Sequence, residues 1–461
     1  MNIHKISASR RRRRFLPVWL LLFAGLLAMT AAARPPARAA DTAEPTTLLV
    51  SVATNGRAGN KVSSQPTISA DGRFVAFTSK ASNLVAGDTN RKTDIFVRDM
   101  LLGQTERVSV ATNGSQANDD SMEPVISGNG RFVVFTSTAT NLVPANLKPL
   151  GDDWYRGPGI SVFIHDRQAH TTTLVSVSSN GVPSDERAWL GDVSYDGRYV
   201  IFSSHCEHLV MPDYNGNRRD VFRHDRVTGI TRMIDLLPNG ENPWEGGSFS
   251  AISADSNRIV YRSLDGGLVA GDTNQAFDIF VYDVLAGTTR RVSVDSSGMQ
   301  GSDMANRPAI SADGRYAAFD TTSSIVTGDS NSRSDIFVHD LVTGATTRVS
   351  IKTDSTQANN HSTQASLSGD GRFVAFTSLA TNLITGDTNG QSDIFLHDRM
   401  TGITHRVSLT AGGGQATGGA STAPRLSADG HSIVFVSTAR NLIPGLKSGS
   451  KGQIYLHVLG E

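Results

Sequence analysis

Short apolar runs alternate with polar turns along most of the chain, and the same arrangement returns at a nearly constant spacing. The clearest copy spans residues 368–398 and reads SGDGRFVAFTSLATNLITGDTNGQSDIFLHD. A period of 57 to 67 residues between successive copies indicates one supersecondary unit per repeat. There are seven copies, anchored on the turn residues Asp71, Asn129, Asp196, Asp255, Asp313, Asp370 and Asp429.

Each copy predicts four short β-strands, which we letter A to D. Strand B is apolar on both of its faces, as in the FVAF run at residues 74–77, so the sheet must be covered on both sides. Stacked four-stranded blades provide that cover, which predicts an all-β fold of the β-propeller type. In the first copy the predicted strands are residues 66–69, 73–79, 94–97 and 105–110, and Asp71-Gly72 forms the hairpin between A and B.

The two ends of the repeat region complement each other. The seventh copy stops after its strand C at residues 453–458, whereas residues 46–52 read as a strand D that precedes any blade. Pairing of these segments closes the ring and covers both strand edges. The sequence therefore predicts a seven-bladed β-propeller with four-stranded blades, in which the N-terminal strand closes the last blade.

The repeat resembles a known family. Its S-x-D-G-R-aromatic run followed by D-I-F-V-x-D is similar to the TolB-like, WD40-like (PD40-type) propeller repeat, and the resemblance covers nearly all of residues 40–461. No Trp-Asp dipeptide occurs, which disfavours a true WD40 protein. The resemblance implies a platform that presents loops to proteins or glycans. TolB itself adds an N-terminal α/β domain, for which this sequence leaves no room, so a Tol–Pal role is not expected.

Residues 1–39 predict a signal peptide, and residues 40–461 the propeller. The consecutive arginines Arg10 to Arg14 precede an apolar run at residues 15–29 that is short for a membrane span, and Ala37-Arg38-Ala39 offers a cleavage site. The RRRFL run from Arg12 matches the core of twin-arginine signals. An ordinary secretory signal and an uncleaved anchor are the alternatives. We expect a periplasmic or secreted protein with no transmembrane span after cleavage.

The charge balance, the cysteine count and one absent motif limit the classes of partner and activity that the sequence predicts. The full chain has no net charge, but residues 1–39 hold eight basic side chains and no acidic one, which leaves 35 basic and 43 acidic side chains. This mildly acidic balance argues against nucleic-acid binding. Cys206 is the single cysteine, so no intramolecular disulfide forms, and we expect a monomer held by packing and strand closure. No G-x-S-x-G motif occurs, so serine hydrolase activity is not implied.

The loop between strands B and C carries a D-x-N-x-x-x-D motif in four copies, and a version one residue longer at Asp213, Asn215 and Asp220. Carboxylate and amide oxygens in a tight loop suit a hard cation such as Ca²⁺, the one candidate cofactor. The alternative is that these side chains form Asx-turns with nearby backbone N–H groups. The candidate metal ligands are Asp88, Asn90, Asp94, Asp272, Asn274, Asp278, Asp329, Asn331, Asp335, Asp387, Asn389 and Asp393.

Two groups of histidines are candidate functional residues. The first follows strand C's apolar triplet, where Arg98 and Tyr282 replace histidine in other copies, so a structural role is favoured. The second group, His205 and His208 with Glu207 and Asp213, could hold a transition metal, as in the metal-dependent lyases of PD40-type propellers, and a polar loop is the alternative. The histidines of the first group are His165, His224, His339, His397 and His457.

Departures from the repeat concentrate on one predicted face. In a four-stranded blade, the B–C loop and the D–A connection to the next blade emerge on the same side, which we call the B–C/D–A face. Exposed aromatic and arginine side chains there are typical of a binding surface, and the alternative is that they plug the channel mouth. The candidate ligand-binding residues are Trp154, Tyr155, Arg156, Glu186, Arg187, Trp189, Tyr214, Trp244 and Glu245.

These observations favour an exported propeller that acts as a protein- or glycan-binding or scaffolding module of the cell envelope. The alternative is a carbohydrate-active enzyme, a lyase or hydrolase, with its site on the B–C/D–A face. A third hypothesis is a mainly structural envelope protein. An enzyme should show acid, base or metal-binding groups that converge from several blades, whereas a binder should show an aromatic and charged patch. None of the candidate residues is predicted to be catalytic.

Overall fold

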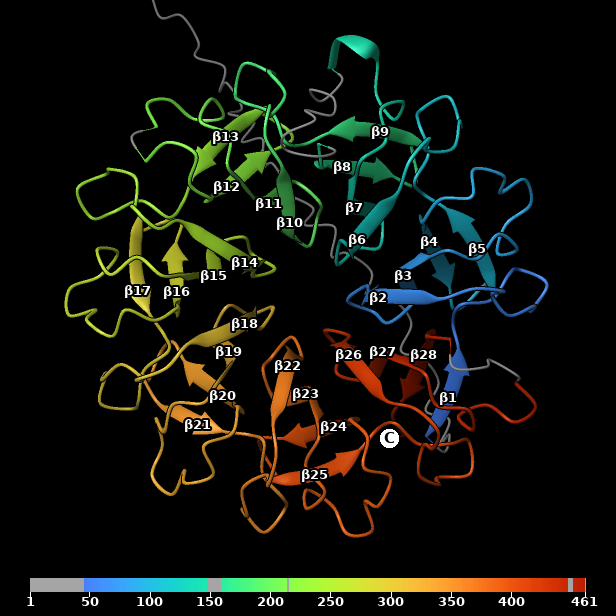
Figure 1. The fold of residues 1–461 in the computed structure, drawn as a ribbon, viewed down its shortest axis with the longest axis vertical. Helices are drawn as coiled ribbons and strands as arrows, with labels where there is room; N and C mark the ends of the chain where they lie inside the picture. Colours follow the sequence, from blue (N-terminus) through green and yellow to red (C-terminus); the bar gives the residue numbers. More distant parts are fainter. Residues whose placement is uncertain (1–44, 148–158, 214, 447–450, 461) are drawn as a thin grey trace, which may run out of the picture. The chain divides into compact units, whose positions relative to one another are not determined.

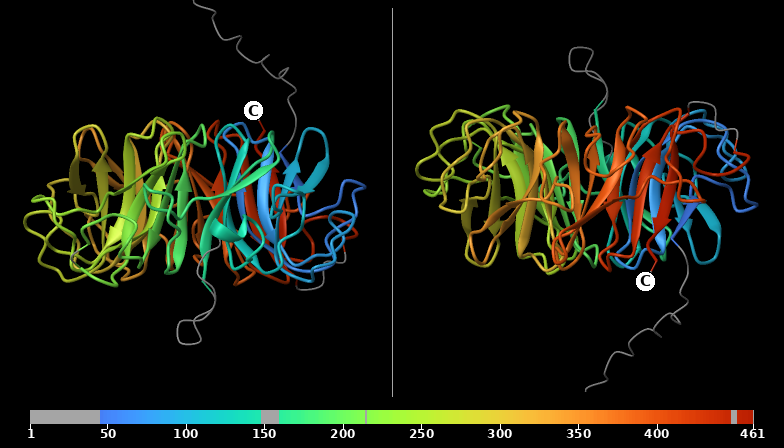
Figure 2. Two further views of the ribbon diagram at one scale, coloured as in Figure 1. Left: turned by 90° about the horizontal axis from the view of Figure 1, so that it is seen from above. Right: turned by 90° about the horizontal axis from the view of Figure 1, so that it is seen from below.

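The computed structural model describes residues 45–147, 159–213, 215–446 and 451–460. These residues belong to one unit, in which seven four-stranded antiparallel sheets stand as blades in a ring (Figure 1). Seen from the side, the loops of all blades emerge on two opposite faces (Figure 2). The predicted all-β, seven-bladed propeller is confirmed.

Each blade is a simple A-B-C-D meander of strands. Blade 1 holds β2 (Ser63–Ile68), β3 (Phe74–Ser79), β4 (Asp94–Asp99) and β5 (Gln104–Arg107), and blade 2 holds β6 (Ser121–Ile126), β7 (Phe132–Ser137), β8 (Ser161–Asp166) and β9 (Thr171–Leu174). Blade 3 holds β10 (Ala188–Val193), β11 (Tyr199–Ser204), β12 (Asp220–Asp225) and β13 (Ile230–Met233), and blade 4 holds β14 (Gly247–Ile252), β15 (Arg258–Ser263), β16 (Asp278–Asp283) and β17 (Thr288–Arg291).

The remaining blades follow the same plan. Blade 5 holds β18 (Ala305–Ile310), β19 (Tyr316–Thr321), β20 (Asp335–Asp340) and β21 (Thr346–Arg348), and blade 6 holds β22 (Ser362–Leu367), β23 (Phe373–Ser378), β24 (Asp393–Asp398) and β25 (Ile403–Arg406). Blade 7 holds β26 (Ser421–Leu426), β27 (Ser432–Ser437), β28 (Gln453–Val458) and β1 (Thr46–Leu49). A single 3₁₀ turn, η1 (Ala145–Leu147), is the one helical element among the described residues, and no helix in this part of the chain is long and apolar enough to cross a membrane.

Strand β1 closes the ring as predicted. It pairs antiparallel with β28, from Thr46 opposite Val458 to Leu49 opposite Tyr455. The strand is shorter than the predicted residues 46–52, because Val52 leaves the sheet and forms an isolated bridge with Ala58. The last blade is therefore built from both ends of the repeat region (Figure 1).

Strand A begins earlier than predicted and contains a β-bulge. In blade 1 the register shifts between Ser64 and Thr67, and Gln65 takes a left-handed conformation with φ of 52°. Pro66 follows Gln65 in the bulge. The ladder needs no N–H donor at this position, so the N–H that proline lacks costs no hydrogen bond. The equivalent residues with positive φ are Glu123, Phe249, Arg307, Gln364 and Ala423.

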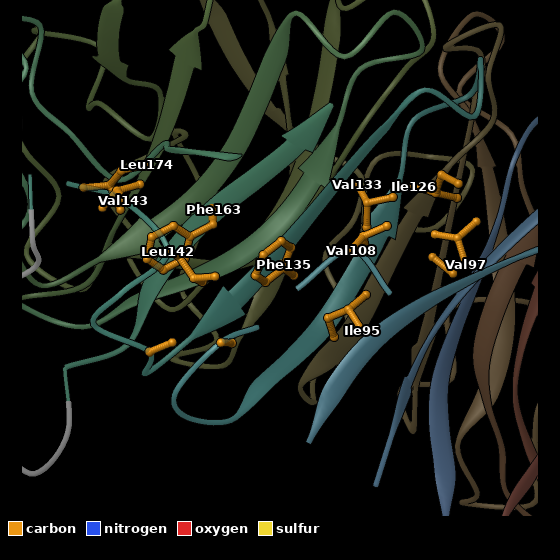
Figure 3. Packing of buried hydrophobic residues seen from close by; sticks show 13 residues of the cluster. Ile95, Val97, Val108, Ile126, Val133, Phe135, Leu142, Val143, Phe163 and Leu174 are labelled. Carbon is orange, nitrogen blue, oxygen red and sulfur yellow. The ribbon is translucent and has the colours of Figure 1, made fainter. Parts of the chain in front are cut away.

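The hydrophobic core lies between blades rather than inside one central space. Figure 3 shows one such layer, in which Ile95 and Val97 of β4 face Val133 and Phe135 of β7 in the next blade. Within each blade, an aromatic ring of strand B packs on one of strand C, as for Phe77 and Phe96 with centroids 5.9 Å apart. This two-sided burial explains why strand B is apolar on both faces. The A strands lie innermost, nearest the axis of the ring (Figure 1).

The S-x-D-G-R motif fastens the A–B hairpin to the C–D turn. Asp71 accepts hydrogen bonds from the Ser69 hydroxyl and from Arg73 N, and Gly72 takes a φ of 72° that the turn requires. The Arg73 guanidinium then binds Asp99, with 2.8 Å between its NH2 and a carboxylate oxygen. The same pair recurs as Arg131–Asp166, Arg198–Asp225, Arg315–Asp340 and Arg372–Asp398.

The histidines that follow strand C's apolar triplet are structural. The Thr172 hydroxyl donates to Val110 O at 2.5 Å and lies 2.8 Å from Nδ1 of His165, which places the N–H on that ring nitrogen. Burial lowers the pKa of His165 to about 4, so the ring is neutral. In blade 7 the threonine is Thr47 of β1, 3.0 Å from His457, which ties the closing strand into the same network.

Candidate functional site

The D-x-N-x-x-x-D loop of blade 1 encloses an arginine. The Arg107 guanidinium, from the end of β5, lies 3.3 Å from an Asp88 oxygen and 3.7 Å from an Asp94 oxygen. Asn90 donates to Asp94 at 2.9 Å through Nδ2, and its Oδ1 accepts from Lys92 N at 3.0 Å. Burial is the main cause that raises the pKa of Asp88 and of Asp94.

The same arrangement is present in the other three loops that share the motif. The asparagine Oδ1 accepts a backbone N–H two residues further on, which is an Asx-turn. The space between the two carboxylates holds a guanidinium, so the residues do not fit a Ca²⁺ ion, which needs oxygens turned toward it. Calcium binding stays a prediction, and the geometry favours the Asx-turn alternative. The arginines between the carboxylates are Arg291, Arg348 and Arg406.

Blade 3 lacks this arginine. Met233 stands at its position, and Asp235 replaces the serine that in blade 1 is Ser109. Asp220 still accepts from Asn215 at 2.8 Å, and the Asp235 carboxylate accepts from two backbone N–H groups, Val221 N at 3.1 Å and Gly247 N at 2.9 Å. Burial is the largest cause that raises the pKa values of both aspartates, and the neighbouring carboxylates raise them further.

The histidine pair of blade 3 does not converge on a metal site. The His205 ring meets Trp189 edge-on, with centroids 5.3 Å apart. His208 instead lies 3.8 Å from Asp185, which also contacts the buried Cys206 thiol at 2.9 Å. Among the described residues, no group of three or more His, Cys, Asp or Glu side chains is placed to hold a metal ion. The polar-loop interpretation fits this geometry.

The tryptophans of blades 3 and 4 lie on either side of one arginine pair. Arg219 covers the ring of Trp189 at 4.3 Å, and its neighbour Arg218 covers the ring of Trp244 at 5.6 Å. Glu245 completes the cluster, 3.4 Å from the Arg218 guanidinium. The Trp244 side chain is 66% exposed and Trp189 is half-buried. We call these five residues the tryptophan surface.

The remaining predicted site residues are less informative. Glu186 and Arg187 immediately precede β10, and their carbonyl oxygens accept from the hydroxyls of Ser184 and Ser204 at 2.9 and 3.0 Å. The predicted residues outside the described part of the chain are Trp154, Tyr155, Arg156 and Tyr214.

Sequence reasoning did not select Arg218, Arg219 or His205 as partners of the tryptophans. A signal was present, because the Arg-Arg dipeptide before strand C occurs in blade 3 alone. In blade 2, the residue equivalent to Trp244 is Asn118, which accepts and donates hydrogen bonds that fasten the D–A connection to Thr140 and Asn141. Blade 4 has thus exchanged a structural amide for an exposed aromatic ring.

A depression of about 440 Å³ on the opposite face, between blades 1 and 2, is lined by Arg73, Phe74, Arg131 and Arg167. Arg73 and Arg131 belong to the hairpin fastenings described above, and Arg167 stacks on Phe74 at 4.2 Å. The same stacking recurs where Arg399 covers Tyr316 at 4.3 Å. This depression is therefore part of the repeated framework.

No protein-family model and no curated protein sequence matches the chain. Solved structures do match. An oligogalacturonate lyase in complex with manganese is 13% identical, with a TM-score of 0.52 over 91% of this chain and 97% of that one. The β-propeller domain of the Trilobed protease from Pyrococcus furiosus is 10% identical, with a TM-score of 0.51 over 87% of this chain and 96% of that one.

The matches with a TM-score above 0.5 show that the chain has a β-propeller fold. TolB from Acinetobacter baumannii is also among the matches, at 14% identity and a TM-score of 0.40; the match covers 72% of this chain and 63% of that TolB. Because all these identities lie far below 25%, the likeness shows the fold and carries nothing about activity. The function of this propeller must therefore be inferred from its own residues.

Proposed function

We propose that this propeller is an exported platform that binds an envelope or extracellular protein or glycan through the tryptophan surface of blades 3 and 4. One observation carries the proposal: Arg219 covers Trp189 and Arg218 covers Trp244 on the B–C/D–A face, where blades 1, 2 and 6 have an asparagine at the position of Trp244. Aromatic and arginine side chains dominate the energetics of interfaces.

The exposure of Trp244 supports a partner. A ring that is two-thirds exposed gains little from burial, and its contact with Arg218 at 5.6 Å is the weaker kind of cation–π interaction found at solvated sites. A partner that covers the ring would remove most of that apolar area from water, which stabilises by about 25 cal/mol per Å² before the costs of association.

Export is the second part of the proposal. It rests on the signal-like residues 1–39 with their twin-arginine core, which predict a periplasmic or secreted location. The alternative function, a carbohydrate-active enzyme, predicts turnover of a bound glycan and is distinguished by the same binding experiment when products are analysed.

The test uses the protein with Trp244→Ala and a matched control, Leu285→Ala. Leu285 is 81% exposed in the same blade but lies in the C–D turn on the opposite face. Each variant is used as bait against an envelope fraction and on a glycan array. We expect Trp244→Ala to lose at least about tenfold in affinity for the captured partner and Leu285→Ala to bind like the parent protein.

Equal binding by the Trp244→Ala and Leu285→Ala variants would overturn the proposed surface. Cleavage of an array glycan by the parent protein would replace the binding proposal with the enzymatic one.

A further inference from the structure

The inner rim of blades 1 and 6 is neutral and closed by hydrogen bonds at the strand A bulge. In blade 1, Gln65 Oε1 at the strand A bulge accepts from the Thr78 hydroxyl at 2.9 Å and from Glu123 N of the next blade at 3.1 Å. Gln364 in blade 6 makes the same pair of contacts, with Thr377 and Ala423 N. At these two positions the amide oxygen makes both of its hydrogen bonds within the ring.

Blades 4 and 5 replace this neutral rim with charged side chains. Arg262 pairs with Ser248 and Asp320 pairs with Asn306, at the register position that Thr78 occupies in blade 1. The bulge residues are Phe249, 54% exposed, and Arg307, whose side chain is 52% exposed. Solvent therefore reaches this part of the innermost strands.

Arg219 of blade 3 lies beside Arg262. A Cβ on Gly246 would be 1.8 Å from the Arg219 carbonyl oxygen, so the start of strand A in blade 4 runs directly against Arg219. That strand pairs with β15 through Ser248 and Arg262. The two guanidinium groups repel each other: burial and then Arg262 lower the pKa of Arg219 to about 10.

Among the described residues, neither of these half-buried arginines forms a close ion pair, although Glu123 attracts Arg219 and Asp320 attracts Arg262 at longer range. Arg219 donates to the Ser203 hydroxyl at 3.0 Å, and Arg262 donates to the Asn306 side-chain oxygen at 2.6 Å. Within the described part of the chain, no carboxylate oxygen lies within 4.0 Å of either guanidinium, and Nε of Arg262 is buried without a hydrogen-bond partner. Arg307 is 3.5 Å from Asp320.

Aromatic rings hold the guanidinium planes. Arg262 stacks on Phe277 at 4.1 Å and on Phe249 at 4.7 Å, while Trp189 lies under Arg219 at 4.3 Å. Stacking engages the flat faces of a guanidinium and leaves its N–H edges for planar anions, which arginine binds in a bidentate manner. A half-buried positive charge with a free edge is stabilised most by an anion.

We propose that Arg219, Arg262 and Arg307 form a binding site for the oxyanion group of a small ligand, a carboxylate, phosphate or sulfate, at the inner rim of blades 3 to 5. The site goes beyond the proposed partner surface, because Arg262 and Arg307 do not belong to the tryptophan surface. Glu123 and Asp320 flank the site, and their carboxylates favour a positive or hydrogen-bond-donating group elsewhere on the ligand.

Calorimetric titration tests the proposal with three probes: malonate, inorganic phosphate and inorganic sulfate, at one ionic strength set with sodium chloride. We expect saturable binding by the parent protein, and an affinity at least about tenfold weaker in Arg262→Gln and in Arg307→Gln. Arg290→Gln is the matched control, because Arg290 is an exposed arginine of the same blade that donates to Leu341 O at 2.7 Å. It should bind like the parent protein.

Binding of all three probes supports a general oxyanion site, and binding of malonate alone supports a carboxylate site. Absence of saturable binding, or equal losses in Arg262→Gln and Arg290→Gln, overturns the proposal. If circular dichroism shows that Arg262→Gln does not fold, Arg307→Gln provides the test, because the Arg307 side chain is half-exposed. Trp244→Ala should leave the titrations unchanged, which separates failure of this site from failure of the proposed partner surface.

Discussion

Blade 3 and blades 1, 4, 5 and 6 use the same loop motif with different numbers of acidic and basic groups. In the four regular blades, two carboxylates face one arginine from strand D, and a serine hydroxyl donates to the deeper carboxylate, as Ser109 does to Asp94 at 2.6 Å. Blade 3 keeps Asp213 and Asp220 but has Met233 and Asp235 instead of the arginine and serine. It therefore gathers three carboxyl groups without a cation, whereas each regular loop sets one arginine between two carboxylates.

The difference shows what the repeated unit is. The D-x-N motif is only part of the repeated unit. The arginine between its two carboxylates comes from strand D, which lies outside the motif. Blade 3 accommodates its extra carboxylate through Gly247, where a Cβ would lie 2.9 Å from an Asp235 oxygen; regular blades have Ser or Ala at this position. Exchanging residues between the two versions tests this interpretation.

The largest effect is expected when a regular blade receives the methionine of blade 3. The Arg348 guanidinium lies 3.2 Å from an Asp329 oxygen and 3.7 Å from an Asp335 oxygen. Arg348→Met leaves both buried carboxylates without a cation. Breaking a buried ion pair on one side destabilises by about 3 kcal/mol. Urea unfolding measures the change, with Arg290→Met as the control at an exposed arginine. A loss below about 1 kcal/mol would contradict the assignment of this arginine as the structural cation.

The next effect depends on pH. Folding raises the pKa values of Asp220 and Asp235 above the value near 3.9 of an unfolded chain. Folded blade 3 therefore favours protonated carboxyls and loses stability as the pH rises from about 4 through the folded-state pKa values. Asp235→Ser removes one of these groups and installs the regular residue.

We expect the stability of Asp235→Ser, relative to the parent protein, to be higher at pH 8 than at pH 5 by at least about 1 kcal/mol. Denaturant titrations at the two pH values measure this difference. Ser109→Ala in blade 1 is the control, because it alters the equivalent hydrogen bond without removing a charge. A pH-independent difference would mean that the two aspartates do not share a raised pKa.

A smaller gain is expected from Met233→Arg, which places a cation beside Asp213 and Asp220. At pH 8 the new pair should stabilise by about 1 kcal/mol, and the gain should shrink as the pH falls and the carboxyls become protonated. Met233→Leu controls for packing at this buried position. A gain of the same size at pH 5 would point to packing rather than charge.

The smallest effect concerns calcium. Since an arginine already lies between the carboxylates of the regular loops, adding Ca²⁺ or a chelator should shift the melting temperature by less than about 1 °C. Thermal scans over a wide Ca²⁺ range measure this. A shift that Asp387→Ala reduces would restore the calcium hypothesis for the regular blades, and one that Asp213→Ala abolishes would place a site in blade 3.

The fold was largely predictable because its signals are local. The Asp71-Gly72 hairpin, the two-sided apolar strand B and the unpaired residues 46–52 each specify their own structure, and together they determine seven blades. The bulge in strand A was missed because Gln65, Phe249 and Arg307 adopt positive φ without being glycine. In blades 1, 2, 5 and 7 the proline that follows the bulge residue was the usable clue.

The candidate site was less predictable, since its partners meet only after folding. Asp88 and Asn90 looked like cation ligands, but Arg107 completes their module from a different strand. Trp189 and Trp244 were selected because they depart from the repeat, and their role stays a prediction. Arg262 was not selected, because only the strand register shows that it stands where blade 1 has Thr78. Composition does not reveal such an exchange.

Because β1 pairs with β28, the ring cannot close until nearly the whole chain has been synthesised. Thr47 and His457 meet although they are 410 positions apart, so the last blade has no complete sheet until a ribosome has synthesised the chain through β28. Until then β1 has no strand partner. Such long-range closure slows folding far more than it lowers stability. We therefore expect the unpaired strand edges of the nascent chain to need protection until β28 has been made. A proteolytic cut that frees β1 would break the β1–β28 pairing that closes the ring.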